Sequence, residues 1–146
     1  MLNYCFPGKK GASAGIGVWW GDDHKMNTAE PASRPTNNCA EIEAAIKAIR
    51  LAKGSDVQKL KVFTDSQFLI NCVTKWLPGW KKNGWKTKSN EDVKNKVELQ
   101  VLDKLLDNKS SPGFKLKWQH VRGHQGIYGN EKADELARRG AEKYKP

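Results

Sequence analysis

Short apolar, β-rich segments alternate along this chain with segments of helical periodicity. Residues 14–20 (AGIGVWW) and 60–64 (LKVFT) predict strands, and residues 24–30 predict a weaker one. Residues 114–121 (FKLKWQHV) alternate apolar and polar side chains, which is typical of a half-buried strand. The pattern alone therefore predicts four strands, spread from one end of the chain to the other.

Apolar residues recur at three- and four-residue intervals between residues 38 and 53, with Ile42 and Ile49 on one face. This spacing predicts a helix. Asn38 is the expected N-cap of this helix, and Glu41, three residues later, would complete a capping box.

Three further helices are expected. The first follows residues 65–66, which can cap it, and stops at the Pro–Gly pair 78–79. The second covers residues 91–107, and Asn130 caps the last. Strands that alternate with helices predict the α/β class: a mixed sheet flanked by helices, in a single domain over residues 1–146.

The composition points to a polyanionic partner. The 146 residues include 26 Lys and Arg against 16 Asp and Glu, a net charge of +10. This excess is the footprint of nucleic-acid binding, although the same charge can serve solubility alone. No apolar run approaches the ~18 residues that span a bilayer. The first residues do not resemble a secretory signal, and the three cysteines show no CxxC spacing. We expect an intracellular protein without a membrane segment; nuclear, mitochondrial and cytoplasmic placement all remain open.

Three acids and one histidine stand where sites form in α/β proteins, at the junctions of strands and helices. Glu41 lies in the first turn of its helix, Asp65 ends a strand, and Asp134 follows a loop that carries His124. Converging carboxylates suit hard cations such as Mg²⁺, and two such ions can activate water at a phosphodiester. Each acid alone also has a structural interpretation, as a helix cap or as a solvated acid near a helix N-terminus.

Five segments occur in order along the chain: AGIGVWWG (14–21), TNNCAEIEAAIKAI (36–49), VFTDSQFLI (62–70), WLPGWKKNGWKTK (76–88) and HVRGHQGIYGNEKADELAR (120–138). In this order they resemble type 1 ribonuclease H, and the tryptophan-rich basic insert is similar to the cellular rather than the retroviral branch. The resemblance implies a ribonuclease H-like fold with a mixed five-stranded sheet. It also implies Mg²⁺-dependent hydrolysis of the RNA strand of RNA–DNA hybrids.

The resemblance implies roles for individual residues. Glu41, Asp65 and Asp134 match three metal-binding acids, with Mg²⁺ as cofactor and Mn²⁺ as a substitute, and His124 matches a histidine that moves protons or product. Thr36, Asn37 and Asn38 match a loop that contacts the nucleic-acid backbone, and Phe68 and Asn95 resemble a sugar contact and a phosphate contact. The chemistry of their side chains adds further expected nucleic-acid contacts: Arg34, Trp76, Trp80, Lys81, Lys82, Trp85, Lys86 and Lys88. Aromatic rings and cations suit the sugars and phosphates of a DNA strand, although two of the tryptophans, four residues apart, could instead face the core. The expected partner is an RNA–DNA hybrid, bound by a monomer.

The pattern breaks near the first residue. The family's first strand carries an aspartate that contacts both metals, and counting back from residue 14 puts its place at Met1. No acid precedes Asp22 in this sequence. Loss of a ligand that bridges two ions predicts cleavage reduced by orders of magnitude.

That first strand is central in the family's sheet, and a gap there would expose unpaired backbone groups. We expect residues 2–6 (LNYCF) to fill the gap as a partner of residues 14–20. Asn3 or Cys5 would then approach the metal site without supplying a carboxylate.

Alternatives therefore stay open. The chain is either a truncated form of an active ribonuclease H or a degenerate relative, and its function is either hybrid hydrolysis or hybrid binding without cleavage. An integrase-like nuclease would share the superfold but would show a different acid spacing and no HVRGHQG loop.

Overall fold

The computed structural model describes residues 2–10, 15–34, 36–107, 112–122 and 126–143. The strands are β1 (Leu2–Lys10), β2 (Gly15–Trp19), β3 (Thr28–Pro31), β4 (Lys59–Thr64) and β5 (Lys115–His120). The helices are α1 (Asn37–Gly54), α2 (Gln67–Asn71), the π-helical turn η1 (Cys72–Trp76), α3 (Leu77–Lys82), α4 (Lys96–Leu106) and α5 (Tyr128–Ala141). No helix in these described ranges is long and apolar enough to cross a membrane.

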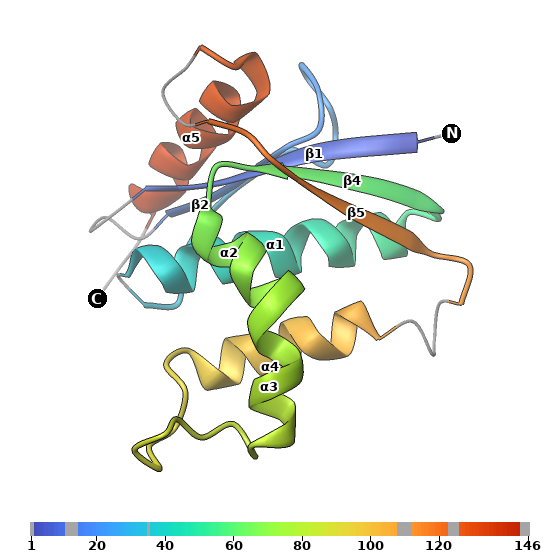
Figure 1. Ribbon diagram of the computed structural model, residues 1–146. Coiled ribbons are helices and arrows are strands. Elements are labelled where there is room, and N and C mark those ends of the chain that lie inside the picture. Colours follow the sequence, from blue (N-terminus) through green and yellow to red (C-terminus); the bar gives the residue numbers. More distant parts are fainter. Residues whose placement is uncertain (1, 11–14, 35, 108–111, 123–125, 144–146) are drawn as a thin grey trace.

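The five strands form one mixed sheet in the order β3-β2-β1-β4-β5. The pairs β1–β2 and β2–β3 are antiparallel, whereas β1–β4 and β4–β5 are parallel. α1 lies along one face of the sheet and α5 packs on the other, over β1, β2 and β3 (Figure 1). The predicted α/β class with a mixed five-stranded sheet is confirmed.

β1 occupies the centre of the sheet and connects its two halves. Residues 2–5 pair with β4, and residues 6–10 pair with β2. The prediction that residues 2–6 form a strand is therefore correct, but their partner was assigned wrongly, because only Phe6 of this segment lies opposite β2. The chain contains more strand here than the pattern indicated, since Pro7, Gly8 and two lysines carry no apolar alternation.

Glycines of β2 allow α5 to approach the sheet closely. A Cβ on Gly17 would overlap the backbone of α5 at Ala133 and Ala137, and one on Gly15 would overlap Ala137 as well. In the opposite direction, a Cβ on Gly140 of α5 would overlap the backbone of Glu30 in β3. The glycines of β2 are thus required for the close packing of α5 on the sheet.

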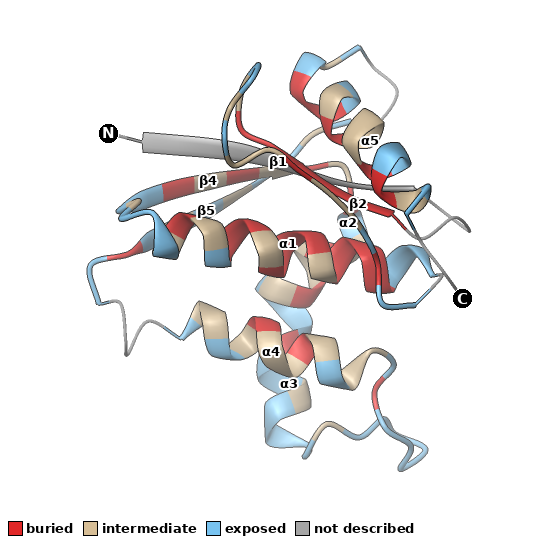
Figure 2. Ribbon diagram, turned by 180° about the vertical axis from the view of Figure 1, so that it is seen from behind, coloured by how far each residue is buried: buried red, intermediate tan, exposed pale blue. Residues whose placement is uncertain are grey.

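The main core lies between α1 and the other face of the sheet. Its fully buried side chains include Ile42, Ile49, Leu60, Val62 and Leu69. Figure 2 shows the buried positions as a continuous stripe along α1 where this helix faces the strands. The predicted apolar face of the first helix is confirmed.

The start of α1 differs from the prediction. Thr36 is the N-cap, and its hydroxyl accepts a hydrogen bond from the backbone N–H of Cys39 at 3.2 Å. Asn38 is already inside the first turn, exposed, and Glu41 is buried. The proposed Asn38–Glu41 capping box is wrong, because Thr36 has the extended backbone that an N-cap needs and lies two residues earlier.

Two further helix boundaries were predicted wrongly. The Pro78–Gly79 pair lies inside α3, because proline is tolerated in the first turn of a helix, where its missing N–H has no intrahelical role. The helix predicted over residues 91–107 begins only at Lys96, because Asn95 adopts a left-handed conformation with φ of 61°.

The last helix also starts earlier than predicted. α5 begins at Tyr128 with Ile127 as N-cap and no capping side chain. Asn130 is therefore not a cap but a buried residue of the first turn, 3% exposed. Its side chain is available for a tertiary contact with another element.

Candidate functional site

Asp65 follows the last residue of β4, and α5 holds its carboxylate. The side-chain N–H of Asn130 donates to Asp65 Oδ2 at 3.1 Å. Ser66 rather than Asp65 caps α2, because its hydroxyl accepts from the N–H of Leu69 at 3.0 Å. The Asp65 carboxylate is therefore free of a capping role and is oriented by a buried amide.

The other two matched acids lie on the two helices that cover the sheet. Glu41 on α1 is only 5% exposed, and Asp134 on α5 is half-buried one turn after Asn130. Both carboxylates take part in interactions within the protein. His124, the predicted proton-moving residue, lies outside the described residues.

The described acids do not gather into a ready metal group. Within the described ranges no three His, Cys, Asp or Glu side chains come together in a way that could hold an ion. A two-ion centre needs several carboxylates and a ligand shared between the ions. The described donors by themselves therefore do not make up such a centre.

The register of β1 shows what is missing. Cys5 pairs with Val62, so the parallel register carried three residues further puts Gly8 level with Asp65. No acid occurs anywhere in β1 (LNYCFPGKK). Asn3 pairs with Leu60 and Cys5 with Val62, so the register puts Gly8, rather than either of these two residues, level with Asp65.

A polar corner formed by Arg34, Asn95 and Glu98 lies near the start of α1. The Arg34 guanidinium donates from Nη2 to Asn95 Oδ1 at 2.8 Å and to Glu98 Oε1 at 2.7 Å. Arg34 and Asn95, which are 61 residues apart, were both predicted to contact nucleic acid, and the structure brings them together. Thr36, Asn37 and Asn38 are exposed at the same end of α1.

Sequence reasoning missed Glu98. This carboxylate sits 2.7 Å from Arg34 and competes for the cation that a phosphate would use. Glu98 lies in the first turn of α4, where an acid is expected for helix stability alone, so the sequence carried no signal of its partner.

Four aromatic rings form a ladder along α2, η1, α3 and the turn that follows α3. Ring centroids are 6.1 Å apart for Phe68 and Trp76, 5.8 Å for Trp76 and Trp80, and 6.4 Å for Trp80 and Trp85. Trp76 is 40% exposed, whereas Trp80 and Trp85 are half-buried against the core. The aromatic ladder therefore exposes the Trp76 ring to solvent, while Trp80 and Trp85 connect it to the core.

The lysines of the basic insert divide into two groups. Lys81 pairs with Asp103 at 3.4 Å and Lys86 with Asp92 at 2.7 Å. The hydrogen bond from Lys86 lowers the pKa of Asp92 below its usual value. The remaining two, Lys82 and Lys88, are exposed.

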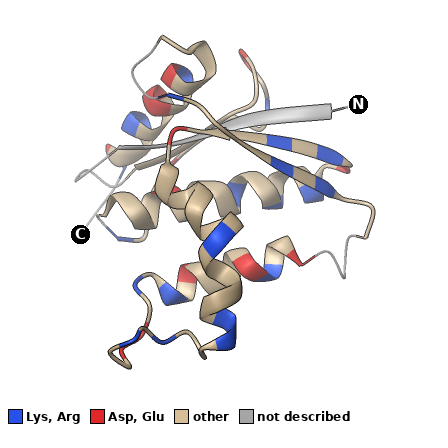
Figure 3. Ribbon diagram, viewed as in Figure 1, with Lys and Arg blue, Asp and Glu red and all other residues tan. Residues whose placement is uncertain are grey.

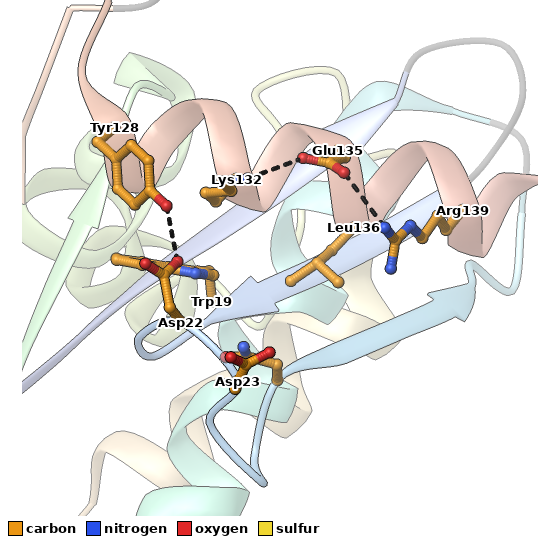
Figure 4. Close-up of a pocket in the computed structure, with 9 residues that line it drawn as sticks. Trp19, Asp22, Asp23, Tyr128, Lys132, Glu135, Leu136 and Arg139 are labelled. Carbon is orange, nitrogen blue, oxygen red and sulfur yellow. Dashed lines mark hydrogen bonds and ion pairs between the residues drawn. The ribbon is translucent and has the colours of Figure 1, made fainter.

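A separate hollow lies on the other side of the molecule, between the turn after β2 and α5 (Figure 4). Its floor contains Trp19 and Leu136, and the Tyr128 hydroxyl donates to Asp22 Oδ1 at 2.7 Å across its mouth. That hydrogen bond raises the pKa of Tyr128 above its usual value. None of the three matched acids lines this hollow, so we do not place the candidate site there.

An α/β sheet of this order, with an acid at the end of its middle parallel strand and a basic aromatic insert, defines a ribonuclease H-like protein. The chain belongs to the RNase H family, whose sequence profile matches residues 4–142, and its relatives place it among type 1 ribonucleases H.

Three comparisons support this assignment. Ribonuclease H1 of Mus musculus is 49% identical over 135 residues, which cover 92% of this chain but 46% of that protein. Ribonuclease HI of Pseudomonas aeruginosa is 40% identical, over 92% of this chain and 84% of that one. A foamy viral protease-reverse transcriptase solved in complex with an RNA/DNA hybrid shares the fold at a TM-score of 0.73 and 20% identity, covering 98% of this chain and 20% of that one. The chain thus spans about half the length of its mammalian relatives.

Proposed function

We propose that this chain binds RNA–DNA hybrids and hydrolyses their RNA strand with Mg²⁺, or Mn²⁺ in its place, far more slowly than a relative with a complete acid set. The observation that carries this proposal is the Asp65 carboxylate, which ends β4 and is oriented by Asn130. The relatives named ribonuclease H and the viral neighbour solved with a hybrid support it.

Two surfaces of the described chain suit the two strands of a hybrid. The exposed start of α1, with Thr36 to Asn38, offers amide and hydroxyl groups that can recognise ribose 2′-hydroxyls. The Arg34–Asn95 corner can take a phosphate, and Trp76 offers a flat ring to a sugar or base of the DNA strand. Binding therefore does not depend on the incomplete acid set.

The slow RNA cleavage that we propose follows from the lack of an acidic residue in β1. Because the described donors by themselves do not make up a two-ion centre, we assign no catalytic step to bound ions in this chain. What the residues themselves provide is a hybrid-binding face and one oriented carboxylate, Asp65. Glu41 and Asp134 remain the proposed companions of Asp65, and His124 the proposed proton carrier.

The direct test is cleavage of a 5′-labelled RNA annealed to DNA, with the chain in Mg²⁺ and then in Mn²⁺. We expect slow cleavage that stops with Asp65→Asn and with EDTA, while hybrid binding persists in both cases. Cleavage that is unchanged by Asp65→Asn would overturn the assignment.

A gain-of-function variant makes the test sharper. Gly8 lies opposite Gly17 and level with Asp65, and a side chain added at Gly17 would point toward α5. Residues that lie directly opposite each other share a face of the sheet. Gly8→Asp therefore adds a carboxylate on the α5 side, where Asp65 contacts Asn130. We expect Gly8→Asp to raise the cleavage rate. Gly8→Asn is the matched control, because its side chain has nearly the same size and shape but carries no carboxylate.

The second candidate function is hybrid binding without cleavage. The absence of any acid in β1 favours it. Tight binding of the hybrid with no product in either metal, together with cleavage by the Gly8→Asp variant, would select this function over the first.

A further inference from the structure

Four lysines form two rows on one face of β4 and β5. Lys59 pairs directly with Lys115, and Lys61 pairs with Lys117. Alternation along each strand puts all four on the same face of the sheet. Figure 3 shows the blue positions of both strands side by side at the end of the sheet away from α5. We call these four residues the lysine face.

This arrangement is unfavourable for folding by itself. Like charges directly opposite each other on neighbouring strands destabilise a sheet. None of the four lysines forms an ion pair with a described acid; the nearest interaction is that of Lys61 Nζ with the Phe63 ring, 5.2 Å from its centroid. Protection of an exposed sheet edge explains lysines on β5, but β4 is an interior strand.

The lysine face is distinct from the candidate site. Phe63, on the same side of β4 as Lys61, packs with Trp19 and with Ala133 of α5. The aromatic ladder packs instead against the core on the α1 side of the sheet. Lys59 begins β4 whereas Asp65 follows its other end, so the lysine face differs from the aromatic ladder in face and from Asp65 in position along the strand.

We propose that the lysine face is a second, sequence-independent nucleic-acid surface that neutralises backbone phosphates. Four ammonium groups in two rows, without an acidic partner in the described ranges, complement a polyanion, and the chain carries a net charge of +10. The aromatic ladder packs against the core on the other face of the sheet, and Asp65 lies at the other end of β4. The lysine face therefore contacts a second nucleic-acid segment, and it does so without any role in cleavage.

The test compares two double variants in binding a fluorescent DNA duplex of about 20 base pairs, from about 50 to 200 mM salt. Lys115→Gln with Lys117→Gln removes half of the lysine face from the edge strand. Lys25→Gln with Lys104→Gln removes two exposed lysines elsewhere and is matched in charge. We expect the first variant to lower the slope of log affinity against log salt by about 2, and the second to lower it by well under 1.

Two further measurements distinguish phosphate binding by the lysine face from unfolding and from protection of the sheet edge. In a Trp76→Ala background, duplex DNA should still shift the backbone amide resonances of residues 115–117. Both double variants should melt at or above the temperature of the parent, which excludes unfolding as the cause of weaker binding. Equal salt slopes for the two variants, with aggregation only in the first, would show that the lysines merely protect the sheet edge and would overturn the proposal. A DNA duplex is no substrate for cleavage, so this result is independent of the proposed function.

Discussion

The Asn130 side chain donates a hydrogen bond to Asp65 Oδ2 across 3.1 Å and so ties the first turn of α5 to the end of β4. The carbonyl oxygen of the same amide is buried without a hydrogen-bond partner in the described part of the chain. Such an oxygen is unfavourable, since it loses water without gaining a donor. We therefore expect Asn130 to contribute little to stability and to act mainly by orienting Asp65.

This relationship predicts a selective loss of rate. Asn130→Ala should lower kcat for RNA cleavage by about 10- to 100-fold, the usual effect of losing a group that orients a ligand carboxylate. KM should stay close to that of the parent, and the melting temperature should change by only a few degrees because an unsatisfied polar atom is removed too. Steady-state kinetics and thermal melting measure both. Gln100→Ala on α4 is the control; a raised KM with unchanged kcat would contradict the assigned role.

The Glu98 carboxylate competes with phosphate for Arg34, because Glu98 Oε1 lies 2.7 Å from Nη2 of the Arg34 guanidinium. Glu98→Gln should strengthen hybrid binding by about 2- to 5-fold, the scale of an exposed ion pair. Fluorescence anisotropy at fixed salt measures the change. Glu142→Gln, an exposed acid at the far end of α5, alters net charge equally and should have a smaller effect. Equal gains in the two variants would mean that net charge alone is responsible.

Trp76 is the exposed ring of the aromatic ladder. Trp76→Ala should weaken hybrid binding about 10-fold or more, since stacking on an aromatic ring contributes ~1–3 kcal/mol. Trp76→Phe should recover most of the affinity. Val97→Ala removes another exposed apolar side chain, 69% exposed on α4, and should leave binding unchanged. A loss with Trp76→Phe as large as with Trp76→Ala would argue against stacking.

The fold was predictable from sequence wherever periodicity and turn residues agreed. The strand before Asp65 and the apolar face of α1 follow from such agreement, and both are confirmed. β1 was anticipated only through the family's central strand, since its residues 7–10 (PGKK) have no strand pattern. Strand register depends on tertiary contacts. Counting back from residue 14 therefore put the position of the family's first aspartate at Met1, whereas the strand pairing puts Gly8 level with Asp65.

The sequence named the candidate site residues but not the contacts that they make in the fold. Asn130 illustrates the difference: its residue type and place before a helix indicated a cap, whereas burial gave it a partner on β4. Arg34 and Asn95 were both expected to contact phosphate, but only the fold brings their side chains together. Local rules describe neighbours in sequence, and these contacts span more than 60 residues.

Because β2 and α5 pack closely, adding a single methyl group to a glycine of β2 should strongly destabilise the fold. Gly17→Ala places a Cβ against the backbone of Ala133 and Ala137, which cannot move without displacing α5. We expect a loss of roughly 1–3 kcal/mol or more in the free energy of unfolding. Gly54→Ala is the matched control, because a Cβ there meets no atom within 4 Å, and it should be neutral or stabilising. Urea unfolding measures both, and equal effects would contradict the close packing.

The two buried thiols predict a distinct pH dependence. Burial raises the pKa of Cys39 and of Cys72 from an ordinary 9.0 to about 12 each, with a hydrogen bond to Glu43 adding to the effect at Cys39. Neither thiol should react with iodoacetamide in the native chain at about pH 8, and both should react in urea, since the thiolate is the nucleophile. Mass spectrometry of the two peptides distinguishes these states.

The raised pKa values of Cys39 and Cys72 also predict that the free energy of unfolding falls at high pH. Above pH 9.0 the unfolded thiols lose protons while the folded ones keep them, so the stabilising contribution is complete below that pH and is lost as the pH rises toward about 12. Other groups titrate in this range, and the comparison is therefore with the Cys39→Ala, Cys72→Ala double variant. The parent should lose more unfolding free energy between about pH 8 and about pH 10.5 than the double variant does. Equal losses in the two proteins would show that the thiols ionise as readily in the fold as outside it.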